Sequence, residues 1–106
     1  MEKPTYLYVI GAENGPIKIG ITGNLTGRLS SIQTGCPFPA IIWFVKPIFS
    51  RALAAKHEQT IHMVYRERRL AGEWFDIDAE QGVEAIQCEI DTHEYFATQG
   101  REREWA

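Results

Sequence analysis

The sequence contains four side chains whose types suit the hydrolysis of a phosphodiester: Tyr8, Lys18, Arg28 and Glu58. This chemistry needs an activated oxygen nucleophile, charge relief on the non-bridging oxygens and usually a divalent cation. The planar guanidinium of Arg28 matches phosphate oxygens, and a carboxylate such as Glu58 can hold Mg²⁺ or Mn²⁺ together with waters and phosphate. Tyr8 has an ordinary pKa of about 10, so it needs a positive neighbour such as Lys18 to act as a base near neutral pH.

Each of these residues also has an ordinary structural explanation. Tyr8 fits a core aromatic, Lys18 a strand residue that reaches water, and Arg28 a solvated helix residue. Glu58 differs, because a carboxylate at the edge of an apolar helix face needs a partner or a metal. His62 follows it by four residues and shares its side of a helix, where it could assist at a metal or phosphate or be a plain core or surface histidine.

The HEQTIH segment resembles a zinc-protease helix, but its spacing argues against zinc. His57 and His62 are five residues apart, about 140° round a helix, so they cannot easily share a metal ion.

Two short strands and a helix must position the first three residues. The apolar segments 6–10 and 17–21 flank a loop with turn-forming residues, which predicts a hairpin. A loop of three or five residues pairs even positions with even ones, which puts Tyr8 and Lys18 on the same face. Asn24 is a good helix N-cap and Gly35 a natural stop, so Arg28 is expected near the first turn of that helix.

The rest of the chain predicts two more strands and two more helices. Segment 40–46 is apolar on both faces, which suggests a strand covered on each side, and Pro47 is expected to end it. Ser50 can cap a helix over 51–68, and 73–75 reads as a short closing strand. The helix is expected to bury Glu58 together with these apolar residues: Leu53, Ala54, Ile61, Val64 and Tyr65.

Asp78 and Gln81 form a variant capping box for the last helix. Gly100 is expected to stop this helix, leaving 101–106 as a frayed tail. The inward face is expected to carry Val83, Ile86, Ile90 and Ala97. The predicted fold class is therefore α/β, with the order ββαβαβα, a short closing strand and a C-terminal helix.

Composition bounds the class of protein. The 106 residues suit one domain, and 44% hydrophobic with 24% charged residues is ordinary for a globular protein. No apolar run approaches the ~20 residues of a membrane helix, and the N-terminus lacks a signal peptide's apolar stretch. Two distant cysteines without metal-ligand spacing read as free thiols in a reducing compartment. We therefore expect a cytoplasmic protein that does not enter a membrane.

Charge is divided unevenly along the chain despite a net charge of only -3. Residues 1–69 carry nine Lys and Arg against four Asp and Glu, whereas residues 70–106 carry two against ten. This asymmetry lets the N-terminal part face a polyanion, although a solvated mixed surface fits equally well.

The chain resembles the GIY-YIG nuclease superfamily, in its phage and bacterial branch that reads KIG instead of YIG. LYVI at residues 7–10 stands at the first motif, KIG at 18–20 at the second, and Arg28 at the family's arginine. QTGCP at 33–37, Glu58 with His62, and GEWF at 72–75 also fit this branch. The ordered set covers residues 6–76.

The resemblance implies a three-stranded antiparallel core sheet flanked by helices, and Mg²⁺-dependent cleavage of DNA. It implies that Tyr8 is the base or positions the water, that Lys18 lowers the pKa of Tyr8, that Arg28 holds the phosphate and that Glu58 binds the metal. Thr22 is expected to contact the DNA beside Arg28 and His62. Residues 1–76 would form the nuclease domain, with 77–100 packed on it as a helix. Thr22 and the preceding Ile21 stand where active relatives often have His, Lys or Tyr, and no asparagine follows Glu58.

Two further hypotheses stay open. A nuclease fold without turnover could bind nucleic acid or a partner protein, and it would bind DNA without needing Glu58. A protein-interaction domain could use Trp43, Trp74 or the acidic helix that starts at Asp78. No zinc finger, helix-turn-helix or long basic arm is visible, so a homodimer or a partner protein could supply any site specificity.

Overall fold

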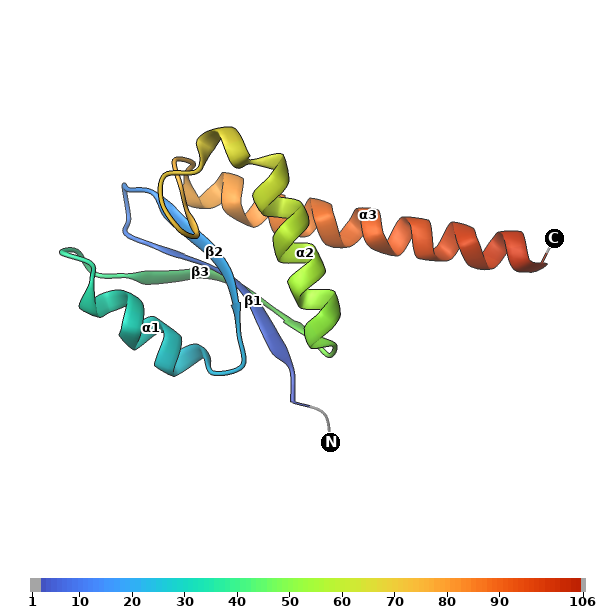
Figure 1. Cartoon of the computed structure of the whole chain (residues 1–106), viewed down its shortest axis with the longest axis horizontal. Helices are drawn as coiled ribbons and strands as arrows, with labels where there is room; N and C mark the ends of the chain where they lie inside the picture. The colour runs from blue at the N-terminus through green and yellow to red at the C-terminus, as the bar shows by residue number, and fades with distance from the viewer. Residues whose placement is uncertain (1–2, 106) are drawn as a thin grey trace.

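A computed structural model describes the backbone of residues 3–105 and the side chains of residues 3–99. The elements follow in the predicted order (Figure 1): β1 (Thr5–Gly11), β2 (Ile17–Thr22), α1 (Leu25–Thr34), β3 (Ile41–Ile48), α2 (Arg51–Val64), a 3₁₀ turn η1 (Arg66–Arg68), β4 (Trp74–Phe75) and α3 (Ala79–Trp105). The strands form one antiparallel sheet in the order β3-β1-β2-β4. The predicted α/β class is confirmed, and β4 adds a fourth strand to the expected three-stranded core.

The hairpin has the predicted register. Ile10 lies opposite Lys18 and Tyr8 lies opposite Gly20, so even positions pair with even positions. Because alternate side chains of a strand point to opposite faces, Tyr8 and Lys18 share a face of the sheet. The odd positions of β1 and β2 point to the other face.

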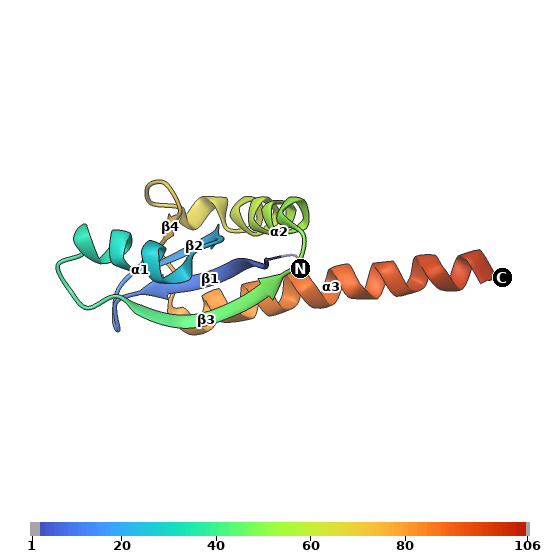
Figure 2. The same cartoon turned by 90° about the horizontal axis from the view of Figure 1, so that it is seen from below.

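The two faces have different covers. Figure 2 shows α1 and α3 on opposite sides of the strands. The face of the odd positions packs against α2 and α3 and holds the larger core, which includes Leu7, Val9, Ile17, Ile19, Ala54, Ile61 and Ile86. The face of the even positions packs Tyr8 and Ile10 against Ile32 of α1. Asn24 caps α1 by accepting a hydrogen bond from Gly27 N, and Gly35 is its C-cap, as predicted.

Strand β3 differs from its prediction. It is an edge strand, and Ile41, Ile42 and Trp43 are 36 to 37% exposed, so the expectation of cover on both sides is wrong. The strand also continues through Pro47 to Ile48. An edge strand tolerates proline because the missing N–H can face away from the ladder.

Helix α2 is shorter than predicted. It ends at Val64, and the chain tightens into η1 before Arg69. Val64 is 67% exposed, so its predicted place on the buried face is wrong, whereas Ala54 and Ile61 are buried as expected. Val64 stands at the last helical position and lines a groove between α2 and α3 that is open to solvent.

Helix α3 is longer than predicted. Asp78 and Gln81 cap it reciprocally, with Gln81 N donating to Asp78 Oδ1 and Asp78 N donating to Gln81 Oε1. The helix passes Gly100 and runs to Trp105, so the predicted stop is wrong. Figure 1 shows its C-terminal half projecting beyond the sheet, and Ala97 is exposed rather than inward. Ala106 lies outside the described residues. Within residues 3–105, no helix combines the length and the apolar character needed to cross a membrane.

Candidate active site

The predicted residues gather around a carboxylate that the sequence analysis did not assign. The Tyr8 hydroxyl donates to Glu73 Oε2 over 3.5 Å, and Lys18 Nζ lies 3.8 Å from the same oxygen. Glu73 directly precedes β4, whose Trp74 pairs with Lys18. The short closing strand therefore carries Glu73 to the centre of the site.

Gly20 makes room for this contact. A Cβ atom at Gly20 would lie 2.5 Å from the Tyr8 hydroxyl oxygen and 2.7 Å from Glu73 Oε2. Real Cβ atoms do not approach other atoms so closely, so any other residue at this position would force the phenol and the carboxylate apart. The glycine of the KIG sequence thus has a packing reason that its spacing alone does not reveal.

The electrostatics of Tyr8 keep its phenol protonated. Burial, and then the Glu73 carboxylate, raise the pKa of Tyr8 well above its ordinary value. The charge of Arg28, on α1, lowers the pKa, and that of Glu58 raises it. Arg28 therefore acts on the phenol through its charge, and Lys18 lies close to Glu73 Oε2 and 5.8 Å from the Trp74 ring centroid.

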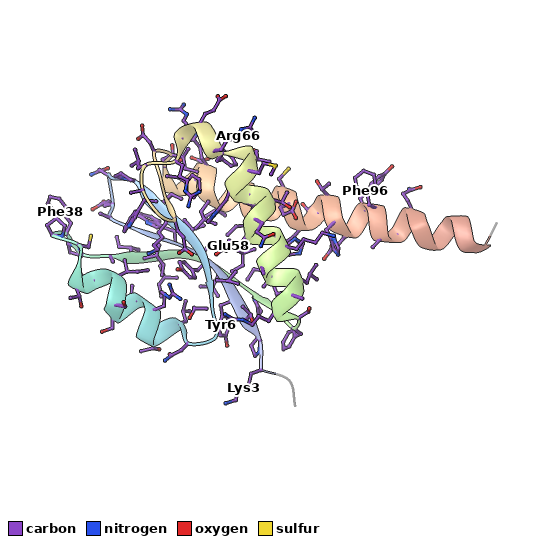
Figure 3. The ribbon with its side chains drawn as sticks, in the orientation of Figure 1. Lys3, Tyr6, Phe38, Glu58, Arg66 and Phe96 are labelled. Atoms are coloured by element: carbon purple, nitrogen blue, oxygen red, sulfur yellow. The ribbon has the colours of Figure 1, made fainter. Side chains whose placement is uncertain are left out.

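Helix α2 brings Glu58 to the edge of β2, and Figure 3 labels it on the side of α2 that faces this strand. Oε2 of Glu58 is buried and has no hydrogen-bond partner. Burial, and then the charge of Glu73, raise the pKa of Glu58, whereas His62 and the backbone N–H of Ile21 lower it. Glu58 therefore lies beside Glu73, where a hydrogen bond between the two carboxyl groups also raises its pKa, and its Oε2 has no donor when both groups are ionised.

The two carboxylates fit a divalent cation. Mg²⁺ keeps most of its waters and binds one or two protein carboxylates together with phosphate oxygens. An unpartnered buried oxygen and two mutually repelling carboxylates are relieved by such an ion. Residues 3–99 contain no group of three or more His, Cys, Asp and Glu side chains arranged to hold a metal, so waters and substrate would complete the coordination.

Two other predicted contacts are engaged with backbone. Thr22 is buried, and its hydroxyl donates to Asn24 O and accepts from Asn24 N in the turn before α1. His62 Nε2 lies 2.8 Å from Ile19 O, and because a carbonyl only accepts, this nitrogen carries the proton. His62 also acts on Glu58 through its charge, whereas the hydrogen bonds of the Thr22 hydroxyl are with Asn24.

The two histidines of α2 serve different neighbours, as their five-residue spacing predicts. His57 is 2% exposed, and its Nδ1 lies 2.7 Å from Glu89 Oε2 of α3. His62 instead faces β2 and packs against the Phe75 ring. These partners explain both histidines without a shared metal.

Glu73 and Gly20 are the residues that sequence reasoning missed. The sequence does offer one indication for Glu73. It directly precedes the closing strand, and a closing strand that pairs with β2 at Lys18 brings Glu73 close to Lys18. The approach of Glu73 to Tyr8, 65 positions earlier, is a tertiary contact that no local pattern encodes.

Comparison with known proteins identifies the family. No curated protein and no solved structure matches the chain. The family model of the T5orf172 domain matches residues 5–90, from the start of β1 to the last buried turn of α3. The chain therefore belongs to the T5orf172 domain family, a phage-associated domain of the nuclease-like type.

Proposed function

We propose that this chain is a metal-dependent endonuclease of the GIY-YIG type that hydrolyses DNA phosphodiesters. The observation that carries the proposal is the buried, unpartnered Oε2 of Glu58 beside Glu73. Leaving such an oxygen without a partner costs free energy, which a bound cation would recover. Membership of a nuclease-like family gives independent support.

The cations of the site suit a phosphate. Arg28 has a planar fork of donors that matches two phosphate oxygens, and Lys18 supplies a second positive charge on the same side of the sheet. Lys18 is half-buried, and its contact with Glu73 is long, so a phosphate can compete for it. Bound at Glu58 and Glu73, Mg²⁺ or Mn²⁺ would supply charge relief for the leaving oxygen.

In this proposal the Tyr8 hydroxyl oxygen accepts a hydrogen bond from the attacking water and so positions it, while its own hydrogen is donated to Glu73. Its raised pKa makes the phenolate scarce near neutral pH, which disfavours the alternative role as a free base. Glu73 accepts the phenol hydrogen and so holds the hydroxyl in place. The water oxygen forms a new bond to phosphorus as the bond from phosphorus to the departing oxygen breaks. The attacking water releases a proton to solvent, and the departing oxygen takes one up from solvent.

The distribution of charge supports approach of DNA from the α1 side. The acidic C-terminal part of the sequence forms β4 and α3, and α3 lies across the sheet from α1. The acidic side chains of α3 that follow its first residue include Glu80, Glu84, Glu89, Asp91 and Glu94. A polyanion would avoid that side and meet Arg28 and Lys18 on the other.

A plasmid-nicking assay tests the proposal. Supercoiled plasmid is incubated with the protein in Mg²⁺, in Mn²⁺ and in EDTA, and nicked product is followed on a gel. We expect nicking with either metal, none in EDTA, and loss of activity in Glu58→Gln and Tyr8→Phe. Glu84→Gln is the matched control, because it removes an exposed carboxylate of α3 outside the site.

Two outcomes contradict the proposal in different ways. If wild type nicks no faster than Glu58→Gln, the protein does not cleave DNA through this site. Salt-dependent DNA binding without nicking, unchanged in Glu58→Gln, would support the nuclease-fold binding module instead, because phosphate contacts rather than a metal would then supply the affinity.

A further inference from the structure

A mainly apolar cleft opens beside the candidate active site. It lies between the loop that joins β1 to β2, the turn after α1 and the segment that leads into β4. Its volume is about 380 Å³, within the range of small-ligand sites. Its walls include Cys36, Pro37, Phe38, Leu70, Ala71 and Trp74. Phe38 is 65% exposed and Leu70 57% exposed, so the walls present apolar side chains to solvent.

Trp74 belongs to both the cleft and the site. Its ring stands under the Lys18 ammonium, 5.8 Å from the centroid, and also packs against the cluster of Tyr8 and Ile10. The cleft is therefore adjacent to Lys18, one of the two proposed phosphate contacts, with Trp74 between them. A second cleft on the far side of Phe38 is also mainly apolar, but it includes the carboxylate of Glu13, which the first cleft lacks.

An apolar slot with an aromatic wall, next to a cation and free of carboxylates, has the chemistry of a nucleotide site. A base stacks on an aromatic ring, while its phosphate binds the neighbouring positive charge. A paired base inside a duplex cannot enter such a slot, because both of its faces are covered by neighbouring bases.

We infer that the cleft between Phe38 and Trp74 holds an unpaired nucleobase of the DNA strand whose phosphate lies at the Tyr8 and Glu73 site. The inference rests on the proposed nuclease function and narrows its substrate class. The preferred substrate is then DNA with an unpaired nucleotide beside the scissile bond, such as a flap, a bulge or a gap. Continuous duplex DNA would be a poorer substrate.

The test compares matched oligonucleotide substrates. A fluorescent duplex, and the same duplex with a one-nucleotide bulge, a flap or a gap, are cleaved in Mg²⁺ and are bound in EDTA by fluorescence anisotropy. We expect wild type to favour at least one unpaired substrate by about fivefold or more, since stacking of one base on an aromatic ring is worth that much. Phe38→Ala should remove most of the preference, and Phe38→Tyr should keep it.

Phe49→Ala is the matched control. Phe49 is 61% exposed, close to the exposure of Phe38, but it follows β3 whereas Phe38 precedes it, so the two rings flank opposite ends of an eight-residue strand. The preference should survive in this variant. Because the side chain of Phe38 is largely in solvent and its backbone carbonyl still accepts from Gln33 Nε2, Phe38→Ala should fold normally.

The outcomes separate this inference from the proposed function. Nicking at equal rates on paired and unpaired substrates, or an unchanged preference in Phe38→Ala, overturns the base site and leaves the nuclease in place. Binding that favours unpaired DNA and is lost in Phe38→Ala, without nicking, supports the base site and overturns the nuclease. Neither nicking nor a binding preference overturns both.

Discussion

Strands β1 and β2 divide their side chains between two faces of the sheet, which both bury apolar residues but differ in the polar groups around them. The odd positions, such as Leu7, Val9 and Ile19, are fully buried among the apolar residues of α2 and α3. The even positions, such as Tyr8 and Lys18, face α1 and gather hydroxyl, ammonium and carboxylate groups. Neighbouring residues on one strand therefore have different surroundings, and alternation along the strand places Tyr8 and Lys18 on the face opposite the larger core.

The sharpest test of this division compares Ile19→Ala with Lys18→Ala. Ile19 is fully buried, so its truncation should lower the free energy of unfolding by about 2–5 kcal/mol. Lys18→Ala should lower it by only about 1 kcal/mol or less, because its ion pair with Glu73 is partly exposed. Urea titrations measure both. Equal losses of stability would show that the two faces are not distinct in energy.

Glu58→Gln should have the largest effect on activity. Supporting residues around a metal commonly cost 10- to 100-fold when changed, so loss of the proposed ligand should slow nicking by about 100-fold or more. The melting temperature should not fall, since the amide removes a charge that burial disfavours. Nicking kinetics and circular dichroism check the two expectations. Activity within a few fold of wild type would exclude Glu58 as a ligand.

Gly20→Ala should damage the site through shape alone. Its Cβ would meet the Tyr8 hydroxyl and Glu73, so we expect about a tenfold loss of nicking and a loss of about 1–3 kcal/mol in unfolding free energy. Gly23→Ala is the matched control, because nothing lies within 4 Å of a Cβ added there. If both variants behave alike, the close approach at Gly20 is not functional.

The smallest predicted effect concerns pH. Because the pKa of Glu58 is raised in the folded protein, the metal-free protein loses stability as pH rises from the ordinary glutamate value of about 4.3 through the raised pKa. Mg²⁺ should offset this loss, so its stabilising effect on the melting temperature should be larger at pH 7.5 than at pH 5. In Glu58→Gln, the shift in melting temperature caused by Mg²⁺ should be similar at pH 5 and pH 7.5. A Mg²⁺ effect independent of pH would contradict the assignment.

Local patterns predicted the parts of the fold that depend on neighbours in sequence. Loop length and strand alternation placed Tyr8 and Lys18 on one face, and the caps of α1 and α3 follow from Asn24 and Asp78. Errors arose where the outcome depends on distant elements. The apolar residues of β3 suggested a covered strand, but sheet order leaves it at an edge.

Part of the candidate site was also predictable from the sequence. Residue types and spacing selected Tyr8, Arg28 and Glu58, but they could not show that Glu73 lies between Tyr8 and Lys18. That arrangement depends on the pairing of β4 with β2, which is a contact between segments far apart in sequence. Likewise, no local sequence pattern indicated that the side chains of Thr22 and His62 would form hydrogen bonds with backbone carbonyl groups.

The contact between His62 and Ile19 O places a side chain where a neighbouring strand would otherwise bind. Beyond the two-residue β4, side chains of α2 contact the backbone at the outer edge of β2: His62 reaches Ile19 O, and Glu58 accepts from Ile21 N. An open strand edge is a template for pairing with other chains. Replacing His62 with alanine would therefore leave the backbone carbonyl of Ile19 free to pair with a strand of another molecule. We expect such a variant to aggregate during purification.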